Sequence, residues 1–240
     1  MERSDFLSGL RRDGEALAAA CERAGLDVAV PSCPGWDLGA LCWHVAGVAE
    51  FWANVVAERA AMPGPFEPRA RPADDVLVAD VRGVLGRLAE LLASTDPATP
   101  IWNWTGADQT AGWVVRRVAH EVAVHRWDAE HAVGDDHTIE ATLASDGIDE
   151  FLTCLLVGEP GTRPDGSVHL HCGDVPGEWT LRPSGAGYEI TREHAKGDCA
   201  IRGTANDILL ALWRRRPVSS VDVVGDTDLA ARFLSYSVLI

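Results

Sequence analysis

The chain has 240 residues, of which 47% are hydrophobic, and a formal net charge of −15 at pH 7. This length and hydrophobic content allow one or two domains with buried cores. The charge argues against binding to nucleic acid or to an anionic membrane, because both would repel such a surface. We also find neither an uninterrupted apolar stretch long enough to cross a membrane nor an N-terminal secretory signal.

Six cysteines are scattered along the chain, at positions 21, 33, 42, 154, 172 and 199, and no two of them form a CxxC pair. This spacing does not suggest a disulfide scaffold and fits a reducing compartment. We therefore expect a cytoplasmic protein.

The first half of the chain shows the 3.6-residue spacing of amphipathic helices. Ser4 is the expected cap of a first helix that stops at Gly25, and a turn over residues 33–37 leads into the second. The four expected helices cover about residues 4–24, 38–59, 77–94 and 108–133. Prolines at positions 63, 65, 68 and 72 mark a loop between the second and third helices. We predict a four-helix bundle over residues 1–137.

The second half, residues 138–240, changes to short strand-like runs separated by glycine-containing turns. Expected strands cover residues 167–172, 178–182, 188–192, 198–202 and 221–224. Expected helices cover residues 139–156 and 205–215, with a last one from residue 228. This order predicts an α+β domain with a mostly antiparallel sheet.

Three side chains able to bind a metal lie on the apolar faces of the predicted helices. Steps of three and four residues place Glu121 and His125 in line with Val118 and Ala129 on the fourth helix. His44 occupies the same kind of position on the second helix. A buried carboxylate is costly unless it is paired or bound to a metal. Two imidazoles and one carboxylate suit Zn²⁺ and leave a fourth position for water or substrate.

The spacing alone leaves other interpretations open. A core histidine is commonly hydrogen-bonded, and a glutamate four residues before a histidine is commonly a simple helix pair. The run from His120 to His125 is one residue too long for the HExxH motif of zinc proteases. His120 points about 100° away from Glu121, which favours a structural role. Iron or nickel would suit the same three ligands as zinc.

His169 and His171 form a second candidate pair. They are two residues apart in a predicted strand, so both side chains lie on one face. No third ligand is evident at a useful spacing, and we therefore favour a structural role for this pair.

These motifs resemble those of the actinobacterial mycothiol-dependent maleylpyruvate isomerase family. The matching pieces are CPGW at residues 33–36 followed by His44, HEVAVHRWD at residues 120–128, HLH at residues 169–171 and GEW at residues 177–179. The resemblance spans nearly the whole chain in the same domain order. It implies a DinB-like four-helix fold for residues 1–137 and an α/β domain related in shape to sterol carrier proteins for residues 138–240.

The resemblance also implies a set of functional residues. It places one zinc ion on His44, Glu121 and His125, which the helical spacing had already singled out. It implies a catalytic arginine in the C-terminal domain, for which we select Arg215, with Arg214 and Arg216 as alternatives. The implied cofactor is mycothiol, a low-molecular-weight thiol, and the implied substrate is a small electrophile.

The reaction expected from this resemblance begins with a thiol whose pKa is lowered by zinc, so that its thiolate adds to an electrophilic carbon. With maleylpyruvate the outcome is isomerisation to fumarylpyruvate, and with another electrophile it is a thiol S-transferase reaction. Two alternatives stay open: a zinc-dependent hydrolase, and a non-catalytic protein that binds an apolar ligand and holds a structural metal.

Overall fold

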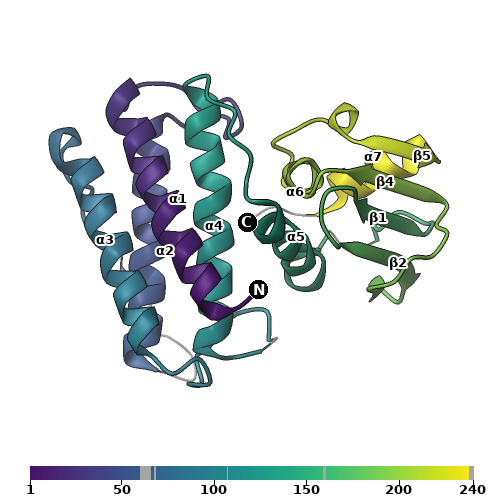
Figure 1. Ribbon diagram of the computed structural model, residues 1–240, viewed down its shortest axis with the longest axis horizontal. Coiled ribbons are helices and arrows are strands. Elements are labelled where there is room, and N and C mark those ends of the chain that lie inside the picture. Colours follow the sequence, from purple (N-terminus) through teal and green to yellow (C-terminus); the bar gives the residue numbers. More distant parts are fainter. Residues whose placement is uncertain (60–65, 68, 107, 159–160, 238–240) are drawn as a thin grey trace. The chain divides into compact units, whose positions relative to one another are not determined.

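The fold is that of a computed structural model, which describes residues 1–59, 66–67, 69–106, 108–158 and 161–237. The chain divides into two compact units, Met1–His137 and Thr138–Ile240 (Figure 1). Of the prolines that mark the expected loop, those at positions 63, 65 and 68 lie outside the described residues.

The first unit is helical throughout most of its described length. Its long helices are α1 (Arg3–Ala24), α2 (Leu38–Glu58), α3 (Asp74–Ser94) and α4 (Ala111–Ala132). Helix α1 packs against α3 and α4, and α2 packs against the same two helices, so the four enclose one core (Figure 1). Each helix contributes fully buried side chains to it, among them Leu17, Leu41, Val81 and Val118. The expected four-helix bundle is confirmed.

Helix α1 begins earlier than its sequence suggested. It starts at Arg3, with Glu2 in the N-cap position, and the backbone N–H of Glu2 donates to the Asp5 carboxylate at 2.8 Å. The expected cap at Ser4 is therefore wrong. An acidic side chain in the first turn satisfies a backbone donor and suits the positive end of the helix dipole.

Helix α2 has the length and the hydropathy of a membrane span, with a mean hydropathy of 1.2 over its most apolar window. Core helices of bundles satisfy the same criterion. Leu41, Val45 and Trp52 of α2 are buried inside the first unit, so we assign α2 to the core of the bundle.

The second unit combines helices with a five-stranded sheet. Its helical elements are α5 (Ala141–Glu150), the π-helical turn η1 (Phe151–Leu155), α6 (Ala205–Leu212), the 3-10 turn η2 (Val218–Ser220) and α7 (Thr227–Tyr236). Its strands are β1 (Val168–Cys172), β2 (Glu178–Ser184), β3 (Gly187–Thr191), β4 (Cys199–Gly203) and β5 (Asp222–Gly225).

The sheet order is β3-β2-β1-β4-β5, with β1 at the centre. Strands β1 and β4 are parallel, and the other neighbouring pairs are antiparallel. This confirms an α+β unit with a mostly antiparallel sheet, and every strand lies within two residues of its expected position.

Helix α6 is shorter than expected and ends at Leu212. Arg214 adopts a left-handed conformation, with φ of 56°, and the backbone N–H of Arg215 donates back to the Leu210 carbonyl at 2.8 Å. Glycine is the usual residue at such a helix end. The arginine run carried no such signal, which is why the sequence suggested a longer helix.

Candidate metal centre

The turn before α2 places the aromatic side chain of Trp36 against the bundle. Gly35 has φ of 86°, a conformation that glycine adopts without strain, and the Asp37 side chain caps the first turn of α2. Trp36, between them, packs on His44 with ring centroids 4.9 Å apart and lies near His125 at 6.4 Å. The expected turn over residues 33–37 is confirmed. It places Trp36 against the rings of His44 and His125.

His44, Glu121 and His125 lie together between α2 and α4; we call them the helical cluster. Nε2 of His44 is 3.1 Å from Oε1 of Glu121, and Nε2 of His125 is 3.2 Å from the same oxygen. The two imidazole rings meet edge to face with centroids 4.8 Å apart. The structure thus brings together the three ligands predicted from the sequence.

The donor atoms of the helical cluster fit a small divalent cation. Ligands bonded to a tetrahedral zinc at 2.0–2.1 Å are separated by about 3.3 Å. Both nitrogen–oxygen separations in the cluster are already close to that value. His125 is 8% exposed, Glu121 17% and His44 34%, so solvent reaches the cluster on the His44 side.

Glu121 has a counter-charge that the sequence argument did not anticipate. Its second oxygen, Oε2, accepts a hydrogen bond from the guanidinium of Arg117, one turn earlier on α4. Burial opposes the ionisation of Glu121, but Arg117 and the two imidazoles hold its pKa well below the usual value. The carboxylate is therefore stable in this position without a metal. The case for a metal rests on the convergence of three donors, not on an unpaired charge.

Asp128 holds His125 in a defined orientation. Nδ1 of His125 lies 2.9 Å from Oδ2 of the fully buried Asp128, and the Cys33 thiol donates to the same oxygen at 3.5 Å. Burial works against protonation of His125, yet its bonds to Asp128, Cys33 and Glu121 raise its pKa well above the usual value. Because Nδ1 of His125 bonds to Asp128, the other ring nitrogen, Nε2, faces Glu121. Asp128 thus orients the imidazole of His125.

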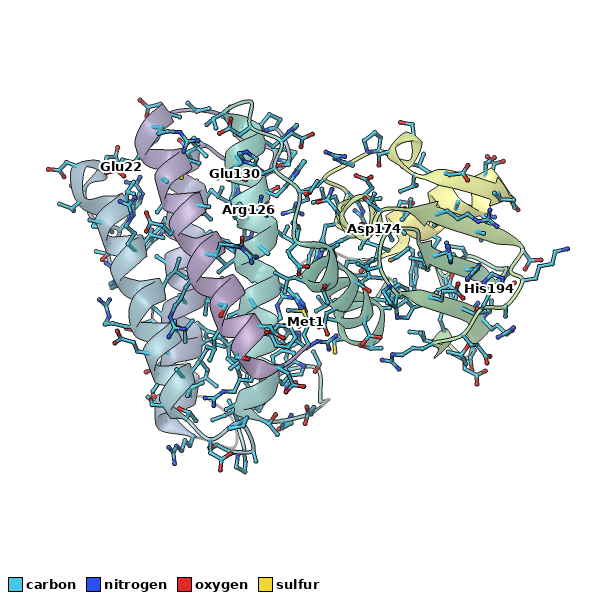
Figure 2. The ribbon with its side chains drawn as sticks, viewed as in Figure 1. Met1, Glu22, Arg126, Glu130, Asp174 and His194 are labelled. Carbon is cyan, nitrogen blue, oxygen red and sulfur yellow. The ribbon has the colours of Figure 1, made fainter. Side chains whose placement is uncertain are left out.

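Three other buried polar residues of α4 have contacts of their own. His120 is buried and meets the ring of Phe6 edge to face at 5.7 Å, which agrees with the structural role expected for it. Farther along α4, Nη1 of Arg126 pairs with Oε2 of Glu130 at 2.7 Å (Figure 2). These residues lie outside the helical cluster.

Arg215 belongs to the second unit, just after α6. Its guanidinium donates to the Trp213 carbonyl at 3.0 Å and lies 5.7 Å from the centre of the Trp213 ring. Arg214 donates to backbone carbonyls near the end of α7, and Arg216 pairs with Asp207 at 2.6 Å. The three adjacent arginines therefore have different surroundings, and Arg215 remains our predicted catalytic residue.

Comparison with known proteins identifies the family of the chain. Residues 7–130 match the sequence profile of the mycothiol maleylpyruvate isomerase N-terminal domain, and residues 142–232 match that of the C-terminal domain of the same family. The chain belongs to the mycothiol-dependent maleylpyruvate isomerase family. No curated protein matches it significantly in sequence.

Solved structures of this family share the fold. The chain superposes on a crystal structure of the mycothiol-dependent maleylpyruvate isomerase with a TM-score of 0.68 and 16% identity, over 95% of each chain. A histidine-to-alanine mutant of a mycothiol-dependent maleylpyruvate isomerase gives the same values. At this identity, the likeness establishes the two-unit architecture of the family.

Sequence reasoning missed several residues around the helical cluster. Arg117 stands four residues before Glu121, and this spacing could have revealed the ion pair. Cys33 and Trp36 belong to the CPGW piece of the family resemblance, but no spacing placed them at the cluster, because they reach it through a turn whose path only the fold defines.

Proposed function

We propose that this chain is a mycothiol-dependent metalloenzyme that acts on an electrophilic small molecule. Family membership supports the use of mycothiol. The observation that carries the proposal is the approach of His44 and His125 to one oxygen of Glu121 at 3.1 and 3.2 Å. In this proposal, the two imidazoles and the carboxylate bind a divalent ion, preferably zinc, and leave one coordination position for a further ligand.

Each side chain in and around the helical cluster has a separate proposed role. His44, Glu121 and His125 hold the ion, which when bound would lower the pKa of a thiol and make its thiolate available near neutral pH. Arg117 keeps Glu121 ionised and occupies Oε2, so that Oε1 faces the histidines. Asp128 keeps Nε2 of His125 turned toward Glu121.

A thiolate supplies a nucleophile that adds reversibly to an electron-poor double bond, so that the bond can rotate before the thiolate leaves. For maleylpyruvate this gives fumarylpyruvate and recovers the thiol. An S-transferase would consume one thiol for each electrophile. Both reactions need the same residues, and they differ only in whether the thiol is returned.

Arg215 is proposed to hold a carboxylate of the substrate, because a guanidinium binds carboxylates in a two-pronged geometry. Arg215→Met should leave the metal content unchanged and weaken turnover of acidic electrophiles more than that of uncharged ones. Equal losses for both substrate classes would assign Arg215 a structural role.

We expect the enzyme to work in the cytoplasm. The described cysteines are all free thiols, and Sγ of Cys21 lies 3.2 Å from Sγ of Cys42 without a bond between them. The expectation rests on the scattered spacing of the cysteines in the sequence, which fits a reducing compartment.

The decisive experiment incubates the zinc-loaded chain with mycothiol and a panel of electrophiles that includes maleylpyruvate. Isomerisation without net thiol loss, or thiol consumption with another electrophile, supports the proposal when a chelator abolishes it. His131→Ala, which removes an exposed histidine of α4 outside the cluster, is the matched control for His44→Ala. Thiol-independent hydrolysis of an ester or amide in the panel would overturn the proposal in favour of a hydrolase.

A further inference from the structure

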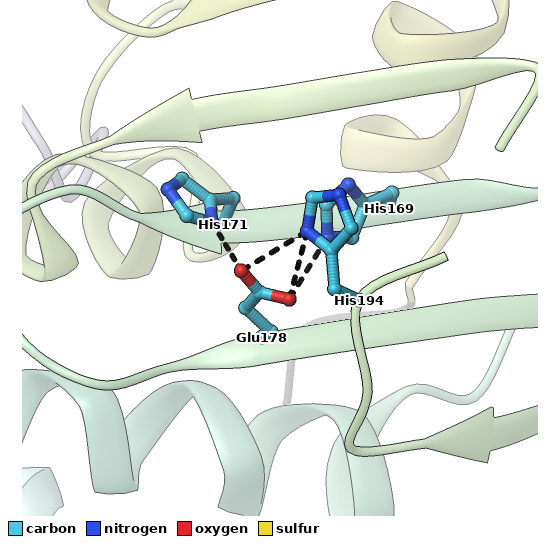
Figure 3. A group of neighbouring side chains, drawn as sticks. All are labelled: His169, His171, Glu178 and His194. Carbon is cyan, nitrogen blue, oxygen red and sulfur yellow. Dashed lines mark hydrogen bonds and ion pairs between the residues drawn. The ribbon is translucent and has the colours of Figure 1, made fainter. Parts of the chain in front are cut away.

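The central strand of the second unit presents His169 and His171 on one face, while Leu170 between them is fully buried on the other. Antiparallel pairing of β1 with β2 places Glu178 directly opposite His171. Nδ1 of His171 lies 2.7 Å from Oε1 of Glu178 (Figure 3). A carboxylate therefore joins the histidine pair from the neighbouring strand.

The loop between β3 and β4 supplies a third imidazole, that of His194 (Figure 3). Nδ1 of His194 is 3.1 Å from Oε1 and 3.0 Å from Oε2 of Glu178. The His169 and His194 rings meet edge to face with centroids 4.8 Å apart. His169, His171, Glu178 and His194 form what we call the sheet cluster. The expectation that the histidine pair lacks further ligands is therefore wrong.

The loop is fixed on both sides of His194. The Thr180 hydroxyl donates to the Glu193 carbonyl at 3.0 Å. On the other side, a Cβ added to Gly197 would lie 2.9 Å from the Ser167 carbonyl oxygen and 3.1 Å from the backbone nitrogen of His169. Only glycine allows so close an approach to β1. The position of His194 over the sheet is thus built into the fold.

His169 of the sheet cluster has a buried ring nitrogen without a hydrogen-bond partner. Its side chain is 4% exposed, and Nε2 makes no hydrogen bond; the nearest oxygen of Glu178 is 3.8 Å away. Buried polar nitrogens without a partner are rare in folded proteins.

We propose that the sheet cluster is a second metal site, which binds a divalent transition ion of the zinc type through His169, His171, His194 and Glu178. The four donor atoms all lie within 4.8 Å of one another. Three imidazoles select zinc, cobalt, nickel or copper over magnesium or calcium, which prefer oxygen ligands.

Binding requires only a small contraction of the cluster. Ligand atoms around a tetrahedral ion are about 3.3 Å apart, and the His194 side chain, 71% exposed, has room to move inward. His171 and Glu178 also line a surface cavity of about 480 Å³, which gives an ion access. With four protein ligands the site is structural, and it joins the loop of His194 to the sheet.

The test uses the full chain, stripped of metal with a chelator and titrated with Co²⁺, whose tetrahedral complexes give strong visible absorption. His44→Ala serves as the background, because it disables the helical cluster. This variant should still bind about one Co²⁺ with tetrahedral bands, on the four-ligand argument. Adding His194→Ala or His171→Ala should weaken binding at least tenfold. Adding His137→Ala, a change of an exposed histidine outside both clusters, should not.

His171→Ala and His194→Ala alter side chains that are at least one-third exposed, so both variants are expected to fold. A melting curve recorded without metal checks this. Zinc content offers a second reading: wild type should retain about two ions per chain and His194→Ala about one. The proposal is overturned if the His44→Ala chain shows no tetrahedral cobalt bands, or if the bands persist unchanged in both His171→Ala and His194→Ala. Neither result bears on whether the helical cluster supports thiol chemistry.

Discussion

The helical and sheet clusters contain similar donors but balance their charges in different ways. Glu121 has Arg117 on one oxygen and two imidazoles on the other, and its donors already have the spacing of a zinc site. The contacts of Glu178 are to imidazoles, the His194 side chain is largely exposed, and Nε2 of His169 makes no hydrogen bond. Under the two proposals, the first cluster is organised before a metal binds, whereas a metal completes the second.

The largest effect is expected from His44→Ala. It removes one of three ligands of the helical cluster, and we predict a loss of thiol-dependent turnover of at least about 100-fold, since changes that merely touch such ligands already cost about 10–100-fold. Turnover with a saturating electrophile measures it. His194→Ala, which alters the sheet cluster, should keep turnover near that of wild type. Similar losses in both variants would break the distinction between the clusters.

Arg117→Met should destabilise the metal-free protein by about 3 kcal/mol, because it leaves the mostly buried Glu121 without its guanidinium partner. Added zinc should recover part of this loss through binding to the folded state. Urea unfolding with and without chelator measures both quantities. Glu178→Gln in the more exposed sheet cluster should cost less than about 1 kcal/mol. Equal losses of unfolding free energy in Arg117→Met and Glu178→Gln would show that Glu121 and Glu178 do not differ in how their charges are balanced.

Asp128→Asn should weaken zinc binding at the helical cluster by about 10–100-fold, because a neutral amide in this position cannot hold Nδ1 of His125 as an anionic acceptor does. Competition with a chromophoric chelator measures the affinity. Asp135→Asn, which removes an exposed partner of Arg23, is the control and should leave the affinity unchanged. Unaltered affinity in Asp128→Asn would mean that packing alone orients His125.

The smallest effect concerns the loop that carries His194. The backbone N–H and hydroxyl of Ser167 donate to Asp198 and lower the pKa of its carboxyl group. Because this pKa is lower in the folded state, the bonds contribute stability above the ordinary Asp pKa, and that contribution is lost as the pH falls through the folded value. Ser167→Ala should therefore be slightly less stable than wild type at pH 7, with a smaller difference at acid pH.

Urea unfolding of metal-free protein at several pH values checks this prediction, and Ser167→Thr, which keeps the hydroxyl, should behave as wild type. A difference that does not shrink toward acid pH would mean that the Asp198 carboxylate does not support the loop.

The two clusters also differ in how far the sequence predicted them. The helical cluster follows from a local rule, because residues three and four apart share a helix face, and this rule selected Glu121 and His125. The sheet cluster depends on strand register and on a loop path. Glu178 comes opposite His171 only after β1 and β2 pair, and His194 arrives through a loop fixed partly by Gly197. Sequence spacing contains neither fact, so only the pair of histidines was visible.

Arg117 marks a different limit of prediction. The apolar stripe of α4 correctly placed Glu121 near the core, but the argument treated its charge as needing a metal. The ion pair with Arg117 supplies the same neutralisation from the same helix. The strands and most helices were predictable because each has its own apolar pattern, whereas the end of α6 was not, because Arg214 takes a conformation usual for glycine.

The most direct test of the helical metal centre is a crystal grown with zinc and measured on both sides of the zinc absorption edge. We predict an anomalous peak about 2.0–2.2 Å from Nε2 of His44, Nε2 of His125 and a carboxylate oxygen of Glu121. A zinc-containing crystal without a peak at these three atoms, in which they keep their direct contacts, would contradict the proposed metal centre.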